Sequence, residues 1–316
     1  MQRRALLALP VLASPALAQD WPTRSIRIVV PFTPGGPVDV VARLIAERLR
    51  DRLGQPVLID NRPGAGGNLG IRMVAQAPPD GATFLLTSSS LAIGPAIQGS
   101  QAVDPRTELT PISLVIELAT TIAGRPDGRF ASFDALLREA RAQPGTVTYG
   151  SSGIGSSNHL SAALLCATAG INIVHVPYRG AALSMNAVMA RDIDVVFAST
   201  VETLAAHHDG RARILAVTTP ARIAALPDVP AAIEFVPGYV APNWFAFAGP
   251  PGLPAPIVAR LSAEFTAMRA EPEFRARLVA LGTEPLMSSP AALSERLARD
   301  VPTWQRVATE AGIRAE

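Results

Sequence analysis

Hydrophobic residues along this chain recur with two spacings, which predict two kinds of element. Short apolar runs, such as residues 25–32 and 82–90, are typical of buried strands. Residues 38–54 instead carry apolar side chains three and four positions apart, which predicts an amphipathic helix. The order strand, helix, strand, helix, strand over residues 25–90 predicts a parallel sheet with right-handed crossovers.

Two extended apolar runs divide the rest of the chain. The first, residues 111–126, precedes a second alternating series, and the second, residues 238–254, precedes an almost entirely helical end. Because these closing helices have no predicted strands of their own, we expect them to pack on the first series. The pattern therefore predicts an α/β protein of two lobes joined by two crossing strands. Lobe 1 is predicted to comprise residues 19–120 and 240–316, and the inserted lobe 2 residues 121–239.

The first eighteen residues have the features of a secretory signal peptide. Arg3 and Arg4 precede an apolar run that ends in the small residues Ala16 and Ala18. This order of basic start, apolar middle and small-residue exit is typical of export signals. We expect cleavage after Ala18 and export of the mature chain to the periplasm. A buried N-terminal helix is the alternative interpretation of the same run.

Composition restricts the partners and the chemistry. Hydrophobic residues make up 48% and charged residues 17% of the chain, which is enough for a large core. The 28 basic and 26 acidic residues become 26 of each when Arg3 and Arg4 are removed, which argues against nucleic acid or an anionic membrane as partner. The only cysteine is Cys166, so the chain has no internal disulfide partner. The absence of lysine excludes Schiff-base and P-loop lysine chemistry.

Glycine and polar residues gather where predicted strands end and helices begin. Residues 31–39 form a first such loop, with Gly35, Gly36 and Asp39, and residues 150–160 form a second, with three glycines and four serines. In the cleft between lobes, their backbone N–H groups and helix dipoles suit an anion such as a carboxylate. Asp39 suits capping of its helix and ligand binding equally well. Weaker candidates at other strand ends are Ser88, Ser89 and Ser199.

Enzyme signatures are not found in the sequence. Residues 64–70 do not match the dinucleotide-binding fingerprint, and residues 150–155 do not match the nucleophile elbow of hydrolases. The four histidines lack the spacing of a metal site, so we expect no metal, no cofactor and no catalytic residue. An exported hydrolase is the alternative, and its only candidate pair is a serine of the second loop with His159.

Several segments together resemble the Bug family of receptors for tripartite tricarboxylate transporters, which are TctC-like proteins. The resembling segments are residues 26–70, 77–90, 143–165, 171–182, 214–230 and 238–258. The resemblance implies a periplasmic binding protein of the type II-like fold, in which two α/β lobes close about a hinge. It also implies that the protein is not an enzyme: it captures a small organic acid and delivers it to an integral membrane permease.

The family's loops for carboxylate recognition match this chain residue by residue. The matching positions are Phe32, Gly35, Gly36, Asp39, Ser152, Gly153, Gly155 and Ser156. A further family segment matches at Asn61, Gly66, Gly67 and Asn68, which the resemblance implies to shape the cleft.

Two departures from the family pattern lie at the predicted cleft. Pro37 and Val38 stand where relatives commonly have glycine and threonine, which removes a hydroxyl donor. Ala198 and Ser199 stand where relatives often have Asp-Asn, which removes an acid and disfavours ammonium groups, hence amino-acid ligands. The sequence leaves open whether the partner is a permease or a sensor of a two-component system. We expect a monomer.

Overall fold

The computed structural model describes residues 21–241 and 243–313, which form a mixed α/β structure. The predicted signal peptide, residues 1–18, lies outside the described residues. The strands are β1 (Ile26–Val30), β2 (Val57–Asn61), β3 (Thr83–Ser88), β4 (Thr110–Leu118), β5 (Thr120–Gly124), β6 (Thr148–Ser151), β7 (Val174–Pro177), β8 (Val195–Ser199), β9 (Arg213–Val217), β10 (Asn243–Gly249) and β11 (Thr283–Pro285). The α-helices are α1 (Pro37–Leu53), α2 (Asn68–Ala75), α3 (Ser90–Gln98), α4 (Phe133–Ala142), α5 (Ser157–Ala169), α6 (Ala181–Ala190), α7 (Thr200–His208), α8 (Ala255–Ala270), α9 (Pro272–Val279) and α10 (Pro290–Glu310), and η1 (Ala65–Gly67) is a 3-10 turn.

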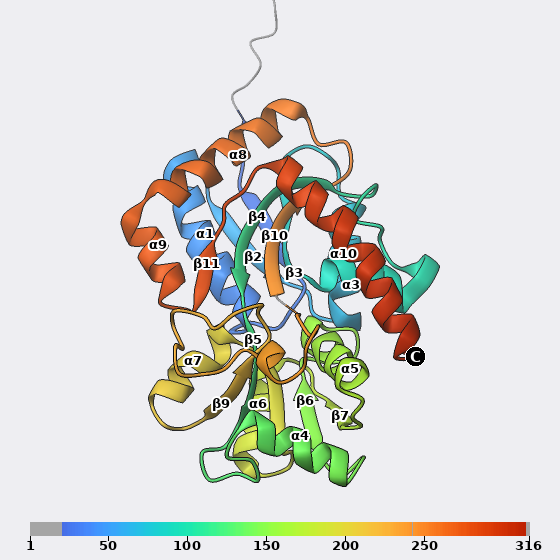
Figure 1. Cartoon of the computed structure of the whole chain (residues 1–316). Coiled ribbons are helices and arrows are strands. Elements are labelled where there is room, and N and C mark those ends of the chain that lie inside the picture. The colour runs from blue at the N-terminus through green and yellow to red at the C-terminus, as the bar shows by residue number, and fades with distance from the viewer. Residues whose placement is uncertain (1–20, 242, 314–316) are drawn as a thin grey trace, which may run out of the picture.

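The strands form two sheets, one in the upper half and one in the lower half of Figure 1. The upper sheet has the order β11-β4-β10-β3-β1-β2, in which β1 is parallel to β2 and β3, and β10 is antiparallel to β3 and β4. The lower sheet has the order β7-β6-β8-β5-β9, in which β6 is parallel to β7 and β8, and β5 is antiparallel to β8 and β9. The parallel pairing predicted for the first three strands is therefore confirmed.

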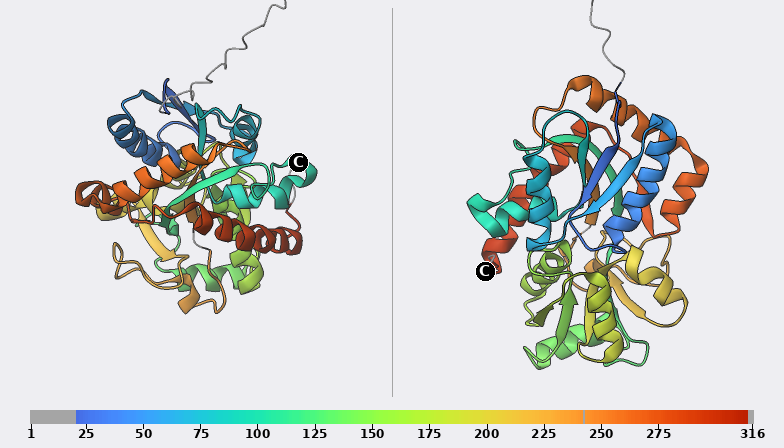
Figure 2. Two further views of the ribbon diagram at one scale, coloured as in Figure 1. Left: turned by 90° about the horizontal axis from the view of Figure 1, so that it is seen from above. Right: turned by 180° about the vertical axis from the view of Figure 1, so that it is seen from behind.

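Helices cover both faces of the upper sheet. Ile28 and Val30 of β1 pack with α1, α8 and α9 on one face, whereas Val29 packs with α2, α3 and α10 on the other. This alternation follows the two-residue period of a strand. Figure 2 shows the same arrangement from behind, with the blue α1 and the orange α8 and α9 on one side and α3 and α10 on the other. The closing helices thus pack on the first sheet, as the pattern predicts.

The lower sheet is covered in the same way. Phe197 of β8 packs toward α4 and α5, and its neighbour Val196 packs toward α6 and α7. The hydrophobic core on the α5 side continues into the upper half of the molecule, where α5 contacts α10. One hydrophobic core therefore spans both halves on this side of the molecule.

Two elements were not predicted from the sequence. Residues 90–98 form α3, whose residues Leu91, Ala92 and Ile93 are all buried, so the segment shows no helical alternation of apolar and polar positions. The expectation that the closing part has no strand is wrong, because β11 pairs with β4. A strand of three residues is too short to show a period of two.

The chain passes between the two sheets at two places. Only Ala119 separates β4 of the upper sheet from β5 of the lower sheet. The return passage starts at Thr218, whose N–H donates to the carbonyl of Thr120 at 2.9 Å, and leads to β10. The lobe boundaries at residues 120–121 and 239–240 stay a prediction.

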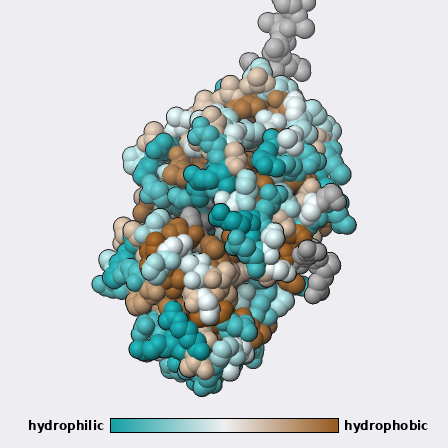
Figure 3. Space-filling model, turned by 45° about the vertical axis from the view of Figure 1, so that its right-hand side comes forward, coloured by the Kyte–Doolittle hydropathy of each residue, from teal (hydrophilic) through white to brown (hydrophobic). Residues whose placement is uncertain are grey.

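The molecular surface carries both polar and apolar side chains. On the face seen in Figure 3, hydrophilic side chains are spread over both halves and hydrophobic ones form separate patches. Exposed arginines pair with nearby acids, for example Arg222 with Glu234 at 2.8 Å and Arg277 with Glu47 at 3.0 Å. Among the residues that the structure describes, no helix combines the length and the apolarity that crossing a membrane requires.

Candidate functional site

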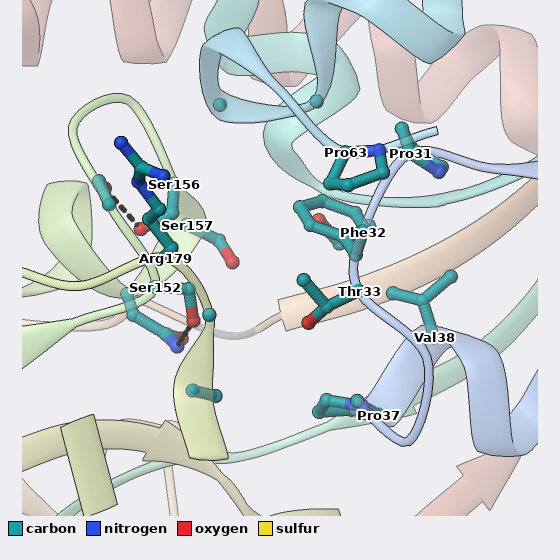
Figure 4. Close-up of a pocket in the computed structure, with 18 of the residues that line it drawn as sticks. Pro31, Phe32, Thr33, Pro37, Val38, Pro63, Ser152, Ser156, Ser157 and Arg179 are labelled. Atoms are coloured by element: carbon teal, nitrogen blue, oxygen red, sulfur yellow. Dashed lines mark hydrogen bonds between the residues drawn. The ribbon is translucent and has the colours of Figure 1, made fainter. Parts of the chain in front are cut away.

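A cavity of about 630 Å³ lies between loops of the two sheets. The β1–α1 loop contributes Phe32, Thr33 and Pro37 to one wall, and the β6–α5 loop contributes Ser152 and Ser156 to the opposite wall (Figure 4). The η1 turn, the start of α6, the ends of β3 and β8, the first turn of α7 and β10 also contribute to the walls. The cavity lies at the strand ends because the carboxyl ends of parallel strands carry their loops at one edge of a sheet.

Seven of the eleven ligand-binding residues predicted from the sequence line this cavity. They are Phe32, Gly36, Ser88, Ser152, Gly153, Ser156 and Ser199. Gly66 and Gly67, which the resemblance implies to shape the cleft, also line it. The other four predicted residues do not line the cavity: Gly35, Asp39, Ser89 and Gly155.

The carboxylate of Asp39 is buried in the first turn of α1, and it holds the β1–α1 loop. It accepts hydrogen bonds from the N–H of Gly35 at 2.9 Å, from Arg43 Nε at 2.8 Å and from Asn61 Nδ2 at 3.0 Å. Asn61 Nδ2 also lies 3.1 Å from the carbonyl oxygen of Phe32. Burial by itself would raise the pKa of Asp39, but these hydrogen bonds outweigh it and hold the pKa below its ordinary value of 3.8. Asp39 therefore positions the loop from behind.

Ser89 and Gly155 also support the cavity wall. The hydroxyl of Ser89 donates to Asn243 Oδ1 at 2.7 Å, and Asn243 Nδ2 donates to the hydroxyl of Ser157 at 3.1 Å. This chain of hydrogen bonds joins the start of α3 to the start of α5 across the two halves. The N–H of Gly155 donates to Nδ1 of His159 at 3.3 Å, which fixes the turn before α5.

The β6–α5 loop directs the start of α5 toward the cavity. Ser156 is the N-cap of α5: its hydroxyl accepts from the N–H of His159 at 3.3 Å and donates to the carbonyl of Gly153 at 2.7 Å. Asn158 Nδ2 donates to the hydroxyl of Ser152 at 3.0 Å. The proton of the Ser156 hydroxyl is already donated to Gly153, so the positive end of the helix dipole and the hydroxyl of Ser152 are what this loop offers to the cavity, and both favour an anion.

Two stacked imidazoles lie behind this loop. The rings of His159 and His175 are 4.0 Å apart between centroids, and His175 also stacks on Tyr149. The hydroxyl of Ser151 lies 2.7 Å from Nε2 of His175. Burial lowers the pKa of His159 to about 4, and burial together with the neighbouring His159 lowers the pKa of His175 to about 3. Both rings are therefore neutral at pH 7, and they brace the loop without adding charge to the cavity.

Glu202 is a cavity-lining acid that the sequence interpretation missed. It lies in the first turn of α7, and its Oε2 accepts from the N–H of Ser199 at 2.8 Å and from the Ser199 hydroxyl at 3.0 Å. Its Oε1 is buried without a hydrogen-bond partner among the described residues. Burial raises the pKa of Glu202 to about 7, against the effect of the two bonds from Ser199. Ala198 and Ser199 still lack the acid of the family pattern, but Glu202 places a carboxyl group on the same side of the cavity.

Arg179 is a second charged lining residue that the sequence interpretation missed. It follows β7, so a search of every residue after a predicted strand would have found it. Glu202 carries the signal of a capping box, because it stands three positions after Ser199. Asn243 and Phe245 of β10 also line the cavity, but they lie inside an apolar run, where the sequence gives no signal.

Metal binding and nucleophilic catalysis have no support in the described part of the chain. It contains no group of three or more His, Cys, Asp or Glu residues that could hold a metal ion. The imidazole of His159 accepts from Gly155 and, in the hydrogen bonds of the described residues, meets no serine hydroxyl. Neither Ser151 nor His175 lines the cavity, and Ser151 is fully buried. Burial also raises the pKa of the half-buried Cys166 thiol, which disfavours the reactive thiolate.

Comparison with known proteins identifies the family. The family described as "Tripartite tricarboxylate transporter family receptor" (TctC) matches residues 41–313 of this chain. The chain belongs to this family. The resemblance to Bug and TctC receptors stated from the sequence is thereby confirmed.

Solved structures of periplasmic binding proteins share the fold of this TctC-family chain. It is similar to the periplasmic binding protein BugD, with 32% identity and a TM-score of 0.88 over 94% of this chain and 100% of that one. It is similar to Rpa4515 of R. palustris with adipate, with 33% identity and a TM-score of 0.89 over 93% and 99%. It is also similar to MatC (Rpa3494) from Rhodopseudomonas palustris with bound malate, with 29% identity and a TM-score of 0.85 over 91% and 99%. The matched family is described as a receptor and BugD as a periplasmic binding protein, so the chain has a solute-binding role and is not an enzyme, which removes the hydrolase alternative.

Proposed function

We propose that this TctC-family receptor binds a small organic carboxylate in its cavity and delivers it to an integral membrane permease. The observation that carries the proposal is the start of α5, which faces the cavity with Ser152 and its N-cap Ser156. Backbone dipoles at that point and the hydroxyl donor of Ser152 suit a carboxylate without a dedicated cation. The similar structures that hold adipate and malate support the same class of ligand.

The residues divide into two roles in this proposal. Those that meet the ligand are Phe32, Gly36, Ser88, Ser152, Gly153, Ser156 and Ser199. Those that position them are Gly35, Asp39, Ser89 and Gly155. No bond of the ligand is made or broken, so affinity and release carry the function.

The proposed function also includes export of the chain and a closing motion of its two lobes. We propose that residues 1–18 direct export to the periplasm and that the mature chain acts there as a monomer. We propose further that residues 121–239 form a lobe that closes on lobe 1 about the two passages between the sheets. Closure on the ligand then presents the bound form to the permease. The name of BugD as a periplasmic binding protein and the single residue between β4 and β5 support this interpretation.

A thermal-shift screen of the purified protein tests the ligand class. Mono-, di- and tricarboxylates are compared with a neutral sugar, and at least one acid should raise the melting temperature increasingly with its concentration. At a free concentration of 100 times Kd the expected gain in unfolding free energy is about 2.7 kcal/mol. A sugar that raises the melting temperature when no acid does would refute the proposal. Mass spectrometry of small molecules released on denaturation identifies any acid that is carried through purification.

A pair of serine variants tests the place of binding. Ser152→Ala removes a hydroxyl from the cavity wall, so the affinity for the acid found in the screen should fall about 3- to 10-fold. Ser294→Ala removes an exposed hydroxyl on α10, far from the cavity lining, and should leave the affinity unchanged. Equal affinities in both variants would place the ligand elsewhere. Uptake of the acid by cells with and without this chain tests delivery to a permease.

A further inference from the structure

Arg179 is the only cationic side chain among the described residues that line the cavity. It is exposed, and none of the ion pairs of the described residues includes it, whereas Arg43 of α1, for example, pairs with Asp39. Its backbone is held close to the end of β6, where the β6–α5 loop begins, because the N–H of the preceding Tyr178 donates to the carbonyl of Ser151 at 3.3 Å. The guanidinium is therefore an uncompensated positive charge at a defined part of the wall.

The order of strands in the lower sheet fixes where this charge lies. β7, β6 and β8 are neighbours in that order and run parallel, so their carboxyl ends meet at the same edge. Arg179 follows β7, the loop with Ser152 and Ser156 follows β6, and Glu202 follows β8. Neighbouring strands are about 4.8 Å apart. The start of α5 thus has a cation on one side and an acid on the other.

This asymmetry gives a direction to any ligand that is anchored at the start of α5. A second anionic group that extends toward β8 meets Glu202, which offers no positive charge when protonated and repels an anion once it is ionised above its raised pKa. A second anionic group that extends toward β7 meets Arg179, whose planar guanidinium forms paired hydrogen bonds with a carboxylate. Figure 4 shows Arg179 standing beside Ser152, Ser156 and Ser157, with the cavity between these residues and Phe32.

We propose that Arg179 binds a second carboxylate and that the ligand of this receptor is a dicarboxylate. Its chain runs from the start of α5 toward β7, away from Glu202. This inference rests on the proposed function, because it takes the first carboxylate to be held at the β6–α5 loop. It assigns a specificity role to a residue that sequence reasoning passed over.

Matched acids and arginine variants test the proposal. Isothermal titration gives Kd for succinate, glutarate and adipate, and for the monocarboxylates of equal length: butyrate, pentanoate and hexanoate. The wild type should bind its best diacid at least about 10-fold more tightly than the matching monoacid. Arg179→Gln should raise the Kd for that diacid about 10- to 100-fold and change the Kd for the monoacid by no more than about 3-fold. Arg179→Lys keeps the charge without the paired hydrogen bonds, so its Kd for the diacid should lie between those of the wild type and Arg179→Gln.

The control is Arg141→Gln, which removes an exposed arginine in the last turn of α4, remote from the cavity lining. It should bind every acid as the wild type does. Unchanged diacid binding by Arg179→Gln, or an equal loss for diacid and monoacid, would overturn the proposal while the proposed function stands. If the wild type binds no acid at all, the proposed function fails and this inference fails with it. Melting temperatures without ligand show that each variant is folded.

Discussion

At the scale of single residues, Asp39 shows how a buried charge can shape a binding loop that it does not line. Its carboxylate accepts from Gly35, Arg43 and Asn61 at once. Asp39→Asn replaces one acceptor oxygen by an N–H₂ donor that faces other donors, so the variant should lose about 2 kcal/mol of unfolding free energy. The β1–α1 loop should loosen as well, and the affinity for the bound acid should fall.

Asp51→Asn is the matched control for this prediction, because Asp51 lies on the same helix and is exposed. Urea unfolding and titration calorimetry of both variants give the two quantities. The lowered pKa of Asp39 means that its contribution to stability is present above its unfolded pKa and is lost as the pH falls through the lower folded value. Equal stability of both variants would show that the Asp39 contacts contribute nothing.

Glu202 makes the stability of the protein depend on pH in the opposite sense. Its folded pKa is about 7, whereas the ordinary value is 4.5. Between these values the unfolded chain has released the proton and the folded chain still holds it, so stability falls as the pH rises through this window. A difference of this size corresponds to about 3 kcal/mol. Relative to the wild type, Glu202→Gln should therefore gain about 3 kcal/mol of unfolding free energy from pH 4.5 to pH 8.

Urea unfolding at several pH values checks this expectation. Glu295→Gln, which changes an exposed glutamate on α10, serves as the control and should follow the wild type at every pH. Parallel pH profiles for Glu202→Gln and the wild type would contradict a proton held by Glu202 in the folded protein. The same proton matters for binding, because an ionised Glu202 adds negative charge to the wall of a cavity that we propose to hold anions.

At the scale of elements, the cap of α5 couples helix stability to ligand binding. The hydroxyl of Ser156 accepts from the N–H of His159 and donates to the carbonyl of Gly153. Ser132 caps α4 in the same way, by accepting from the N–H of Ala135, but α4 lies away from the cavity lining. Ser156→Ala and Ser132→Ala should each cost about 1 kcal/mol of stability. Only Ser156→Ala should also lower the affinity for the bound acid, by about 3- to 10-fold. Similar affinities in both variants would argue against α5 as the anchor.

Elements with a clear period were predictable from the sequence, and those without one were not. α1 is amphipathic and β1 is a short apolar run bounded by turns, so both follow from the pattern. α3 is apolar all round with Pro95 inside it, and β11 has three residues, so neither carries a period. The site divides in the same way. Gly36 and Ser156 belong to loops with a distinctive composition, whereas the place of Arg179 depends on the order of strands in a sheet, which composition does not encode.

At the scale of the whole molecule, the close approach of loops from opposite halves offers a test of closure. Gly66 of η1 lies against the β6–α5 loop: a methyl group on it would stand 3.0 Å from the carbonyl oxygen of Ile154. Its φ of +62° is in the left-handed region, so alanine there costs about 1 kcal/mol in strain besides the contact. Gly54, at the end of α1, has a φ of +67° with no atom within 4 Å of the added methyl group.

Gly66→Ala should therefore lose at least as much stability as Gly54→Ala, and only Gly66→Ala should hinder closure of the two halves. We expect its affinity for the bound acid to fall at least about 10-fold, because closure would have to push the two loops apart. Small-angle scattering should show that the radius of gyration of the wild type and of Gly54→Ala decreases when the acid is added. The radius of Gly66→Ala should change less at the same concentration. If Gly66→Ala contracts and binds as Gly54→Ala does, the contact between η1 and the β6–α5 loop is no part of the closed form, and the proposed motion about the two passages loses its support.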